Sequence, residues 1–295
     1  MAVALTFCRV VLAATRTLPP SGAIVVRAGT TATGEYKTVA SAVATLPDDS
    51  SSRSILYTPE HMTSRYLRLH QPHLKLLLQS GDDPSRSPAS SAGSNDASGT
   101  LRIHKNDFKM YNVNVKNAYG PKRQAVAISQ YGSRVGFYAC GFYGYQDTLY
   151  ANAGTQGTTD FIFGGGALAF FGGNTIGVSG PGWVTASGRE SNDAGSYVFD
   201  KNTIVLASGA ASDTSGKAYF GRPWGAYAKV ILVWNVGDER TGNAFFGEYN
   251  SSGGGVSAAC RPSFATVLSA SQAASYSISS AFGSDYANWV DTAYL

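Results

Sequence analysis

Four short segments place polar side chains in otherwise apolar surroundings that are rich in glycine. They begin at Gln124 (QAVA), Gly144 (GYQDTL), Thr159 (TDFIFG) and Gly221 (GRPW). Asp160 is followed directly by Phe-Ile-Phe, and a carboxylate in such a setting is costly to bury unless a counter-ion pairs with it. Arg222 is the candidate counter-ion. Any one segment alone is more typical of an ordinary turn, but the four together indicate a buried carboxylate site.

A repeat that begins near residue 100 can position these side chains. An aromatic residue is followed three residues later by Cys or Asn, and two residues further on by an apolar residue. The copies are Phe137/Cys140/Phe142, Phe171/Asn174/Ile176, Phe199/Asn202/Ile204 and, more loosely, Met110/Val113/Val115. Such repeats are typical of solenoids, in which each coil buries its apolar face against its neighbours and polar residues at one corner can form a ladder. A β-sandwich with similar strands is the alternative.

Composition favours strands over helices. Gly (34), Tyr (17) and Phe (14) are frequent, and the 295 residues are 43% hydrophobic and 14% charged, enough for one large core. The net charge of +4 mildly favours an acidic polymer as partner and is too small to indicate nucleic acid. No apolar run is long enough for a membrane-spanning helix. The three cysteines lack the spacing of a metal site, so we expect neither metal nor cofactor.

The N-terminal part is predicted to contain an export signal and a cap. Residues 1–19 resemble a degraded secretion signal, with Arg9 interrupting its apolar stretch. Residues 22–46 predict a strand at Ala23 to Val26 and an amphipathic helix with Val39, Val43 and Leu46 on one face. This helix would cap a single domain over residues 20–295, in which the Ser-, Pro- and Gly-rich segment 81–99 is a loop. Asn250-Ser251-Ser252 is a glycosylation acceptor if the protein is secreted.

The four segments together resemble the pectin methylesterases, and the fungal members most closely. The resemblance extends from about residue 20 to residue 295. It is carried by YGYQDTLYA, DFIFG and GRPW, and also by SGAIVV, ASGRES at 186–191 and the closing GSDYANWVDTAYL. It implies an all-β fold, a right-handed parallel β-helix with a short N-terminal capping helix. It also implies hydrolysis of the methyl esters of galacturonate units in pectin by a secreted, monomeric enzyme that needs no cofactor.

The resemblance also implies a role for each polar residue. Asp160 would be the nucleophile, and Asp147 the general acid that later acts as base. Gln124 and Gln146 would stabilise the oxyanion. Arg222 would orient Asp160 and keep it ionised, while burial and the Asp160 charge would keep Asp147 protonated. The residues expected to bind the sugar chain are Trp224, Tyr145 and Phe163, with stacking on sugar faces as the physical basis.

The common esterase apparatus is missing from the sequence. No G-x-S-x-G segment occurs, and all four histidines precede the strong motifs. A Ser-His-Asp triad is therefore not expected, and the histidines are interpreted as surface residues or as part of a misassigned segment.

Three departures from the family pattern leave retained catalysis open. Only 13 residues lead from Asp147 to Asp160, whereas the family has about one full coil there, so about eight residues of an aromatic-rich strand are absent. The 34 residues between Cys140 and Asn174 then represent two coils, one of them shortened, and the two aspartates should lie on adjacent strands. Residues 58–80 also diverge, and Phe245-Phe246 replaces a paired Trp motif.

These departures suggest a decayed or mis-spliced family member as the alternative. Such a chain would be a catalytically impaired or inactive solenoid that binds pectin or polygalacturonate. A pectate-lyase-like enzyme is a third interpretation, but the carboxylate clusters that would bind Ca²⁺ are not evident.

Overall fold

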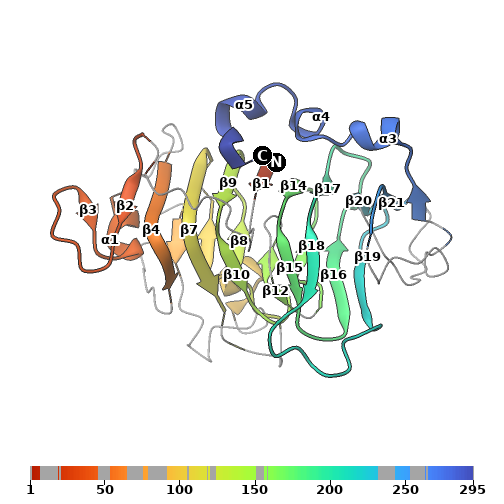
Figure 1. Ribbon diagram of the computed structural model, residues 1–295, viewed down its shortest axis with the longest axis horizontal. Coiled ribbons are helices and arrows are strands. Elements are labelled where there is room, and N and C mark those ends of the chain that lie inside the picture. The colour runs from red at the N-terminus through yellow and green to blue at the C-terminus, as the bar shows by residue number, and fades with distance from the viewer. Residues whose placement is uncertain are drawn as a thin grey trace.

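The chain folds into a solenoid of parallel strands, capped at its N-terminal end and crossed by short C-terminal helices (Figure 1). The computed structural model describes residues 2–6, 19, 21–45, 54–64, 76–78, 92–104, 106–117, 119, 124–150, 156–157, 159–231, 243–252, 263 and 265–294. Every pairing between the described strands is parallel except that of β5 (Leu76–Leu78) with β6 (Leu101–Ile103). Parallel stacking excludes the sandwich alternative and confirms the predicted parallel β-helix.

Each complete coil supplies one strand to each of three stacks. The first stack contains the first part of β4 (Ser54–Ser64), the first half of β7 (Phe108–Lys116), β9 (Val135–Tyr138), β14 (Leu168–Gly172), β17 (Ser196–Asp200), β20 (Lys229–Ile231), β21 (Phe245–Glu248) and β22 (Ala265–Val267). The second contains the rest of β4 and of β7, β10 (Gly141–Tyr143), β12 (Gln156–Gly157), β15 (Thr175–Val178) and β18 (Thr203–Leu206). The third contains β5, β6, β8 (Ile128–Gln130), β11 (Leu149–Tyr150), β13 (Ile162–Gly164), β16 (Gly182–Ser187) and β19 (Ala218–Pro223).

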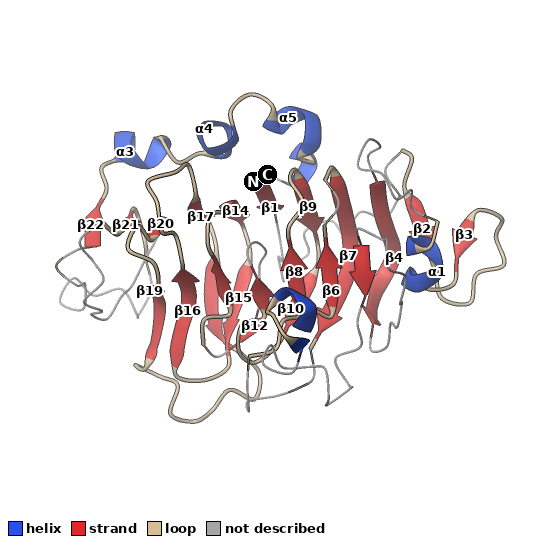
Figure 2. Ribbon diagram, turned by 180° about the vertical axis from the view of Figure 1, so that it is seen from behind, coloured by secondary structure: helices blue, strands red, loops and turns tan. Residues whose placement is uncertain are grey.

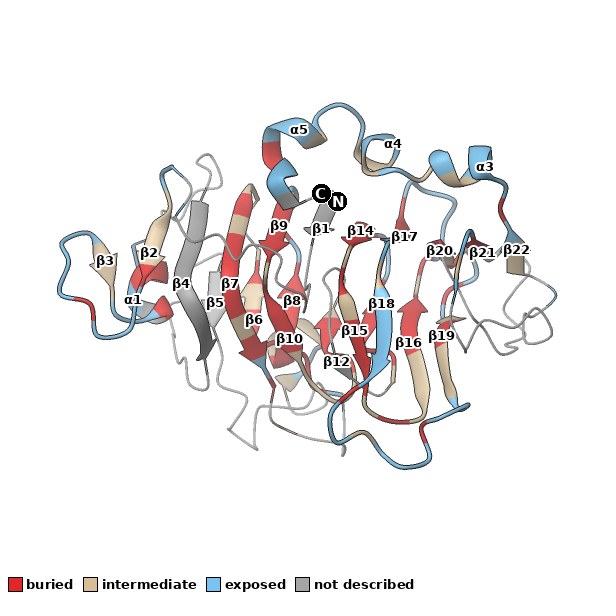
Figure 3. Cartoon of the chain, viewed as in Figure 1, coloured by how far each residue is buried: buried red, intermediate tan, exposed pale blue. Residues whose placement is uncertain are grey.

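The repeat found in the sequence corresponds to these coils. The rings of Phe171 and Phe199 stack at 4.3 Å between centroids, on the paired strands β14 and β17. At the next corner, the backbone N–H and side-chain amide of Asn174 donate to Oδ1 of Asn202 at 2.8 and 2.9 Å. The predicted polar ladder is therefore confirmed for this pair. The apolar residues Val115, Phe142 and Ile176 of the repeat belong to the buried core between the three stacks. Ile204 does not, because β18 is exposed and Ile204 itself is 47% exposed (Figure 3).

A short helix covers the N-terminal end of the solenoid, whereas the C-terminal helices lie along one side of it. At the N-terminal end, α1 (Val39–Val43) follows β2 (Ile24–Val26) and β3 (Glu35–Tyr36), and Val39 and Val43 are buried in the core as predicted. Leu46 lies outside the described residues. Near the C-terminus, α3 (Ala270–Ala274), α4 (Ile278–Phe282), α5 (Tyr286–Trp289) and the 3₁₀ turn η3 (Thr292–Tyr294) run along the ends of the first-stack strands (Figures 1 and 2).

The divergent segment and the predicted loop both contain regular structure. β4 pairs with β7 along its length, with a register shift between Tyr57 and Met62. In the segment predicted as a loop, the 3₁₀ turn η1 (Asp96–Ser98) holds Ser98 buried. No helix among the described residues is long and apolar enough to cross a membrane.

The first residues of the chain form β1 (Ala2–Thr6) in the first stack. β1 pairs in parallel with β9 on one side and with β14 on the other. It therefore occupies the place between coils where the sequence predicted a shortened coil.

Candidate active site

Asp147 and Asp160 occupy equivalent positions on adjacent coils. Each precedes a third-stack strand by two residues, and Leu149 pairs with Ile162. A parallel bridge joins Gln146 to Thr159, so the register continues through both aspartates. Both have left-handed backbone geometry, with φ of 57° and 47°, which is strained for a residue with a side chain and is frequent at functional sites. The predicted adjacency is confirmed despite the short link.

Arg222 holds Asp160 through two hydrogen bonds. Its Nε donates to Oδ1 at 2.8 Å and its terminal nitrogen to Oδ2 at 2.7 Å. Asp160 is only 7% exposed, and a bidentate guanidinium is the strongest counter-ion that a side chain can offer a carboxylate. The guanidinium also lies over the Trp183 ring, 5.3 Å from its centroid. Burial of Asp160 is therefore compensated by a fixed positive charge, as the sequence predicted.

Arg222 reaches Asp160 across an intervening strand. Residue 222 on β19 pairs with Ala186 on β16, which pairs with Phe163 on β13. Because Ala186 has a small side chain, a long side chain on β19 can pass over β16. The preceding position favours a glycine as well, because an ideal Cβ on Gly221 would clash with the side-chain hydroxyl of Thr185.

Asp147 is in the opposite electrostatic situation. It is 2% exposed, and its buried Oδ1 has no hydrogen-bond partner in the part of the chain that the structure describes. Burial, and next the negative charge of Asp160, raise the pKa of Asp147 to about 8, although Arg222 partly opposes this shift. At neutral pH the site therefore combines a protonated carboxyl group with a guanidinium-bound carboxylate.

The two glutamines lie beside Asp147 on neighbouring coils. Gln146 directly precedes Asp147 and is half-buried, while Gln124 precedes β8 and is exposed. The backbone N–H of Ala125 donates to the carbonyl of Gln146 at 3.2 Å, which brings the two coils together at this point. Within the described residues neither side-chain amide is engaged in a hydrogen bond, so both can donate to an incoming group.

A row of aromatic rings runs along the third stack beside the aspartates. Centroids of neighbouring rings are 5.6 Å apart for Tyr131 and Tyr150, 4.8 Å for Tyr150 and Phe163, and 6.4 Å for Phe163 and Trp224. Trp224 is 44% exposed, whereas Phe163 is 2% exposed. Phe163 is therefore covered by its neighbours. Tyr145 is half-buried and stands next to Gln146.

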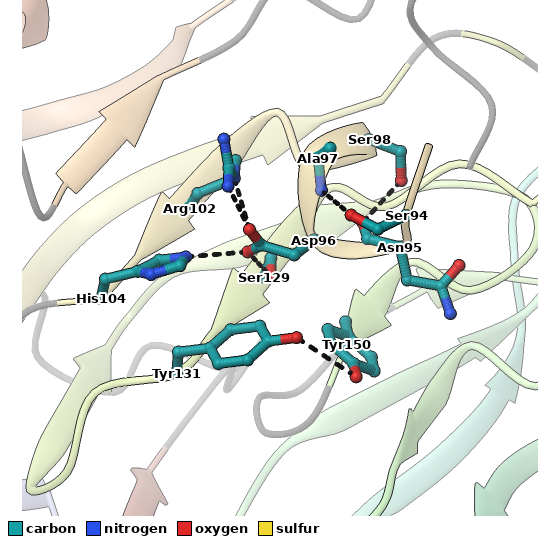
Figure 4. Close-up of polar contacts among 10 residues, drawn as sticks. All are labelled: Ser94, Asn95, Asp96, Ala97, Ser98, Arg102, His104, Ser129, Tyr131 and Tyr150. Carbon is teal, nitrogen blue, oxygen red and sulfur yellow. Dashed lines mark hydrogen bonds and ion pairs between the residues drawn. The ribbon is translucent and has the colours of Figure 1, made fainter. Parts of the chain in front are cut away.

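One end of this row rests on a polar cluster that the sequence reasoning missed (Figure 4). Arg102, His104 and Ser129 all donate to the Asp96 carboxylate, and the His104 ring stacks on Tyr131 at 4.9 Å. Burial opposes ionisation of Asp96, but these hydrogen bonds outweigh it and lower its pKa. Only the coil-length spacing from Tyr131 to Tyr150 could have revealed this row from the sequence. His104 belongs to the row through its stacked ring.

No group of three or more potential metal ligands occurs among the described residues. The polar residues of the site are two carboxyl groups, two amides and a guanidinium. This arrangement can supply a nucleophile, an acid and hydrogen-bond donors to one ester group.

Comparisons with known proteins agree with this chemistry. A family model described as "Pectinesterase" matches residues 23–285. A "Pectinesterase" of Aspergillus niger is 33% identical over 98% of this chain and 97% of its own length. The solved pectin methylesterase of Aspergillus niger in deglycosylated form has a TM-score of 0.74 and 29% identity, covering 95% of this chain and 100% of that one. The carrot pectin methylesterase, at 24% identity and a TM-score of 0.74, covers 94% of this chain and 97% of its own and shares the fold.

Proposed function

Because the chain belongs to the pectinesterase family, we propose a role for each polar residue at its paired aspartates. The protein is a carboxylic ester hydrolase that cleaves the methyl esters of galacturonate units in pectin and releases methanol. The observation that carries the assignment of roles is the opposite electrostatic setting of Asp147 and Asp160 at equivalent positions of adjacent coils.

Asp160 attacks the ester in the first step. One of its oxygens forms a bond to the carbonyl carbon, and the carbonyl oxygen takes up the negative charge. The guanidinium of Arg222 balances the charge of this carboxylate and aims it, since it donates a hydrogen bond to each oxygen. The amides of Gln124 and Gln146 donate to the oxyanion, a contribution worth about 3 kcal/mol for a well-placed donor.

Asp147 transfers the proton that each step needs. As the bond from carbon to the methoxy oxygen breaks, the protonated Asp147 gives its proton to that oxygen and methanol leaves. The galacturonyl group is then bound to Asp160 as an anhydride. Asp147, now a carboxylate, removes a proton from water, which attacks the acyl carbon and releases the acid and free Asp160. Asp147 ends protonated, so the cycle is balanced.

The exposed part of the aromatic row is proposed to hold the sugar chain. Trp224, two residues after Arg222, is 44% exposed, and Tyr145 is half-buried and directly precedes Gln146. Phe163 packs against Tyr150 and Trp224 and is buried. In this proposal Phe163 therefore contributes by supporting its two neighbours, with its ring reached only after they move.

The site of action is proposed to be outside the cell, with the protein acting as a monomer. Pectin is a large polymer, and a hydrolase acting on it must meet it outside the cell that makes the enzyme. The predicted glycosylation acceptor Asn250 is exposed, which is consistent with secretion.

Methanol release from highly methylated pectin tests the assignment. We expect release by the full chain and a loss of at least about 10³-fold in kcat for Asp160→Ala and Asp147→Ala. Asp213→Asn, which changes an exposed carboxylate, serves as the matched control. Equal rates for Asp160→Ala and the full chain would refute the nucleophile. Saturable binding of pectin with no methanol release would instead support the binding-only alternative.

A further inference from the structure

In one coil of the solenoid, the neighbouring chain supplies no described strand to the first stack. The coil with β9, β10 and β11 is complete, as is the coil with β14, β15 and β16. The coil between them has β12 and β13 in the second and third stacks. Only residues 151–155, which lie outside the described residues, separate β11 from β12. Among the described residues, the chain between β11 and β12 therefore supplies no strand to the first stack of this coil.

The chain's own N-terminal segment fills the vacant place. Val3, Ala4 and Leu5 pair with residues 135–137 of β9, and residues 2–6 pair with residues 168–172 of β14. β9 and β14 are thus separated by one strand of remote origin. Figure 1 shows β1 in this position, between β9 and β14.

The alternation of residues in β1 suits a strand that lies between β9 and β14. Leu5 is in register with Phe137 and Phe171, and Val3 with Val135 and Ala169, all of which belong to the buried core. The larger apolar residues of β1 therefore stand at core register positions, and alanines alternate with them. Without a strand here, β9 and β14 would be about 9.6 Å apart, and the facing N–H and C=O groups of both would be unpaired.

We propose that the gap between β9 and β14 is a strand-accepting site for an extended apolar peptide, and that residues 2–6 are its occupant. A strand in this site keeps the coil that carries Asp160 at the normal strand spacing from the coil that carries Asp147. It also completes a stack whose two neighbouring strands are fixed by their other pairings. Removal of residues 1–19, as the cleavage of an export signal would bring about, would leave the site open.

Disulfide trapping tests the occupant directly. Cys8 and Cys260 are first replaced by Ser, and Ala4→Cys is then combined with Phe170→Cys, its register partner on β14. The control pair is Phe170→Cys with Val198→Cys, which are register partners on β14 and β17. We expect both pairs to form an intramolecular disulfide on mild oxidation, visible as a mobility shift on a non-reducing gel. Oxidation of the control pair alone, or a disulfide-linked dimer from Ala4→Cys, would overturn self-occupancy.

Peptide complementation tests the site. A chain beginning at residue 19 should have a Tm lower by more than about 5 °C, and a synthetic peptide of residues 1–8 should bind it saturably and restore the Tm. The same peptide with Val3→Asp and Leu5→Asp should not bind. If the shortened chain does not fold, Ala4→Pro in the full chain replaces it, since proline removes a ladder N–H. Its Tm should fall, whereas Ala28→Pro, at an exposed turn position before Gly29, should have little effect. Unchanged stability on truncation or on Ala4→Pro, or a secreted protein that starts after residue 19 with full stability, would overturn the proposal.

Discussion

Asp147 stands next to Asp160 in the third stack because the register between their coils continues from the Gln146–Thr159 bridge to the Leu149–Ile162 pair. Both aspartates have a left-handed backbone geometry, but their carboxyl groups differ in their partners. Asp160 is held by a guanidinium, and Asp147 has a buried oxygen with no partner in the described part of the chain. This difference in partners underlies the first three predictions.

The pH dependence of kcat should report Asp147. Its pKa is raised to about 8, so the protonated form that can release methanol predominates below that pH and disappears above it. We expect kcat to fall as pH rises through about 8. Methanol release between pH 5 and 10, with Tm measured at each pH to exclude unfolding, checks this limb. A rate that stays constant up to pH 10 would contradict the assignment.

Asp147→Asn should stabilise the protein at neutral pH while abolishing turnover. The pKa of Asp147 is raised to about 8 in the folded protein from 3.8 for an unperturbed aspartate, so between these pH values the unfolded chain releases a proton that the folded chain keeps. Stability from this group is therefore present below about pH 4 and declines as pH rises towards 8. Asparagine removes the penalty, which is about 2–4 kcal/mol at pH 7.

Urea unfolding of both proteins at pH 7 and pH 4.5 measures this difference. The gain should be large at pH 7 and should shrink at pH 4.5. An equal gain at both pH values would point to packing as its cause, with no role for ionisation. Asp213→Asn, at an exposed carboxylate, is the control and should show little change at either pH.

Arg222→Lys should lower kcat by about 10²-fold and change KM little. Lysine keeps the charge but cannot make two parallel hydrogen bonds, so Asp160 loses its fixed aim. Arg222→Gln should in addition destabilise the fold by about 3–5 kcal/mol, since it leaves a buried carboxylate unpaired. Steady-state kinetics and thermal unfolding separate the two effects. Arg134→Gln, which breaks an ion pair whose arginine is 45% exposed, should leave both unchanged.

Gly188→Ala should weaken pectin binding through Trp224. An ideal Cβ at residue 188 would lie 2.5 Å from a ring carbon of Trp224, so the indole must move away from the backbone on which it rests. We expect KM to rise by about 3- to 10-fold, with kcat retained, because sugar stacking contributes about 1 kcal/mol. Gly165→Ala is the matched control, because its nearest neighbour would be 3.9 Å away. Equal KM values for the two variants would refute this role.

Asn202→Ala should destabilise the solenoid without affecting the chemistry. The Asn202 amide accepts from Asn174 and donates to the carbonyl of Phe171 at 2.8 Å. Its loss leaves partly buried donors unpaired, at a cost of about 1–3 kcal/mol. Chemical denaturation measures the cost, and Thr203→Ala, at an exposed strand position, is the control. A change in kcat at a temperature well below unfolding would contradict a purely structural role.

Local patterns in the sequence determined the fold and the composition of the site. The aromatic, polar and apolar spacing of the repeat identifies the coils because each coil must present the same face to its neighbour, as Phe171 and Phe199 do. The 34-residue interval between Cys140 and Asn174 identified the shortened coil for the same reason. Asp147, Asp160 and Arg222 were recognisable because polar residues within apolar, glycine-flanked strands need partners.

Only the tertiary structure decided which distant segments pair with these local motifs and how far their side chains are buried. Pairing of β1 with β9 and β14 joins segments more than 130 residues apart. No local signal in the short, mainly apolar segment AVALT distinguishes a sheet strand from the start of an export signal. The Asp96 cluster likewise unites Asp96 with Ser129 from the next coil. The pKa of Asp147 depends on burial and on the Asp160 charge, which exist only once the coils are stacked. Sequence specifies which groups are present, and the stacking of coils sets their distances and their exposure to water.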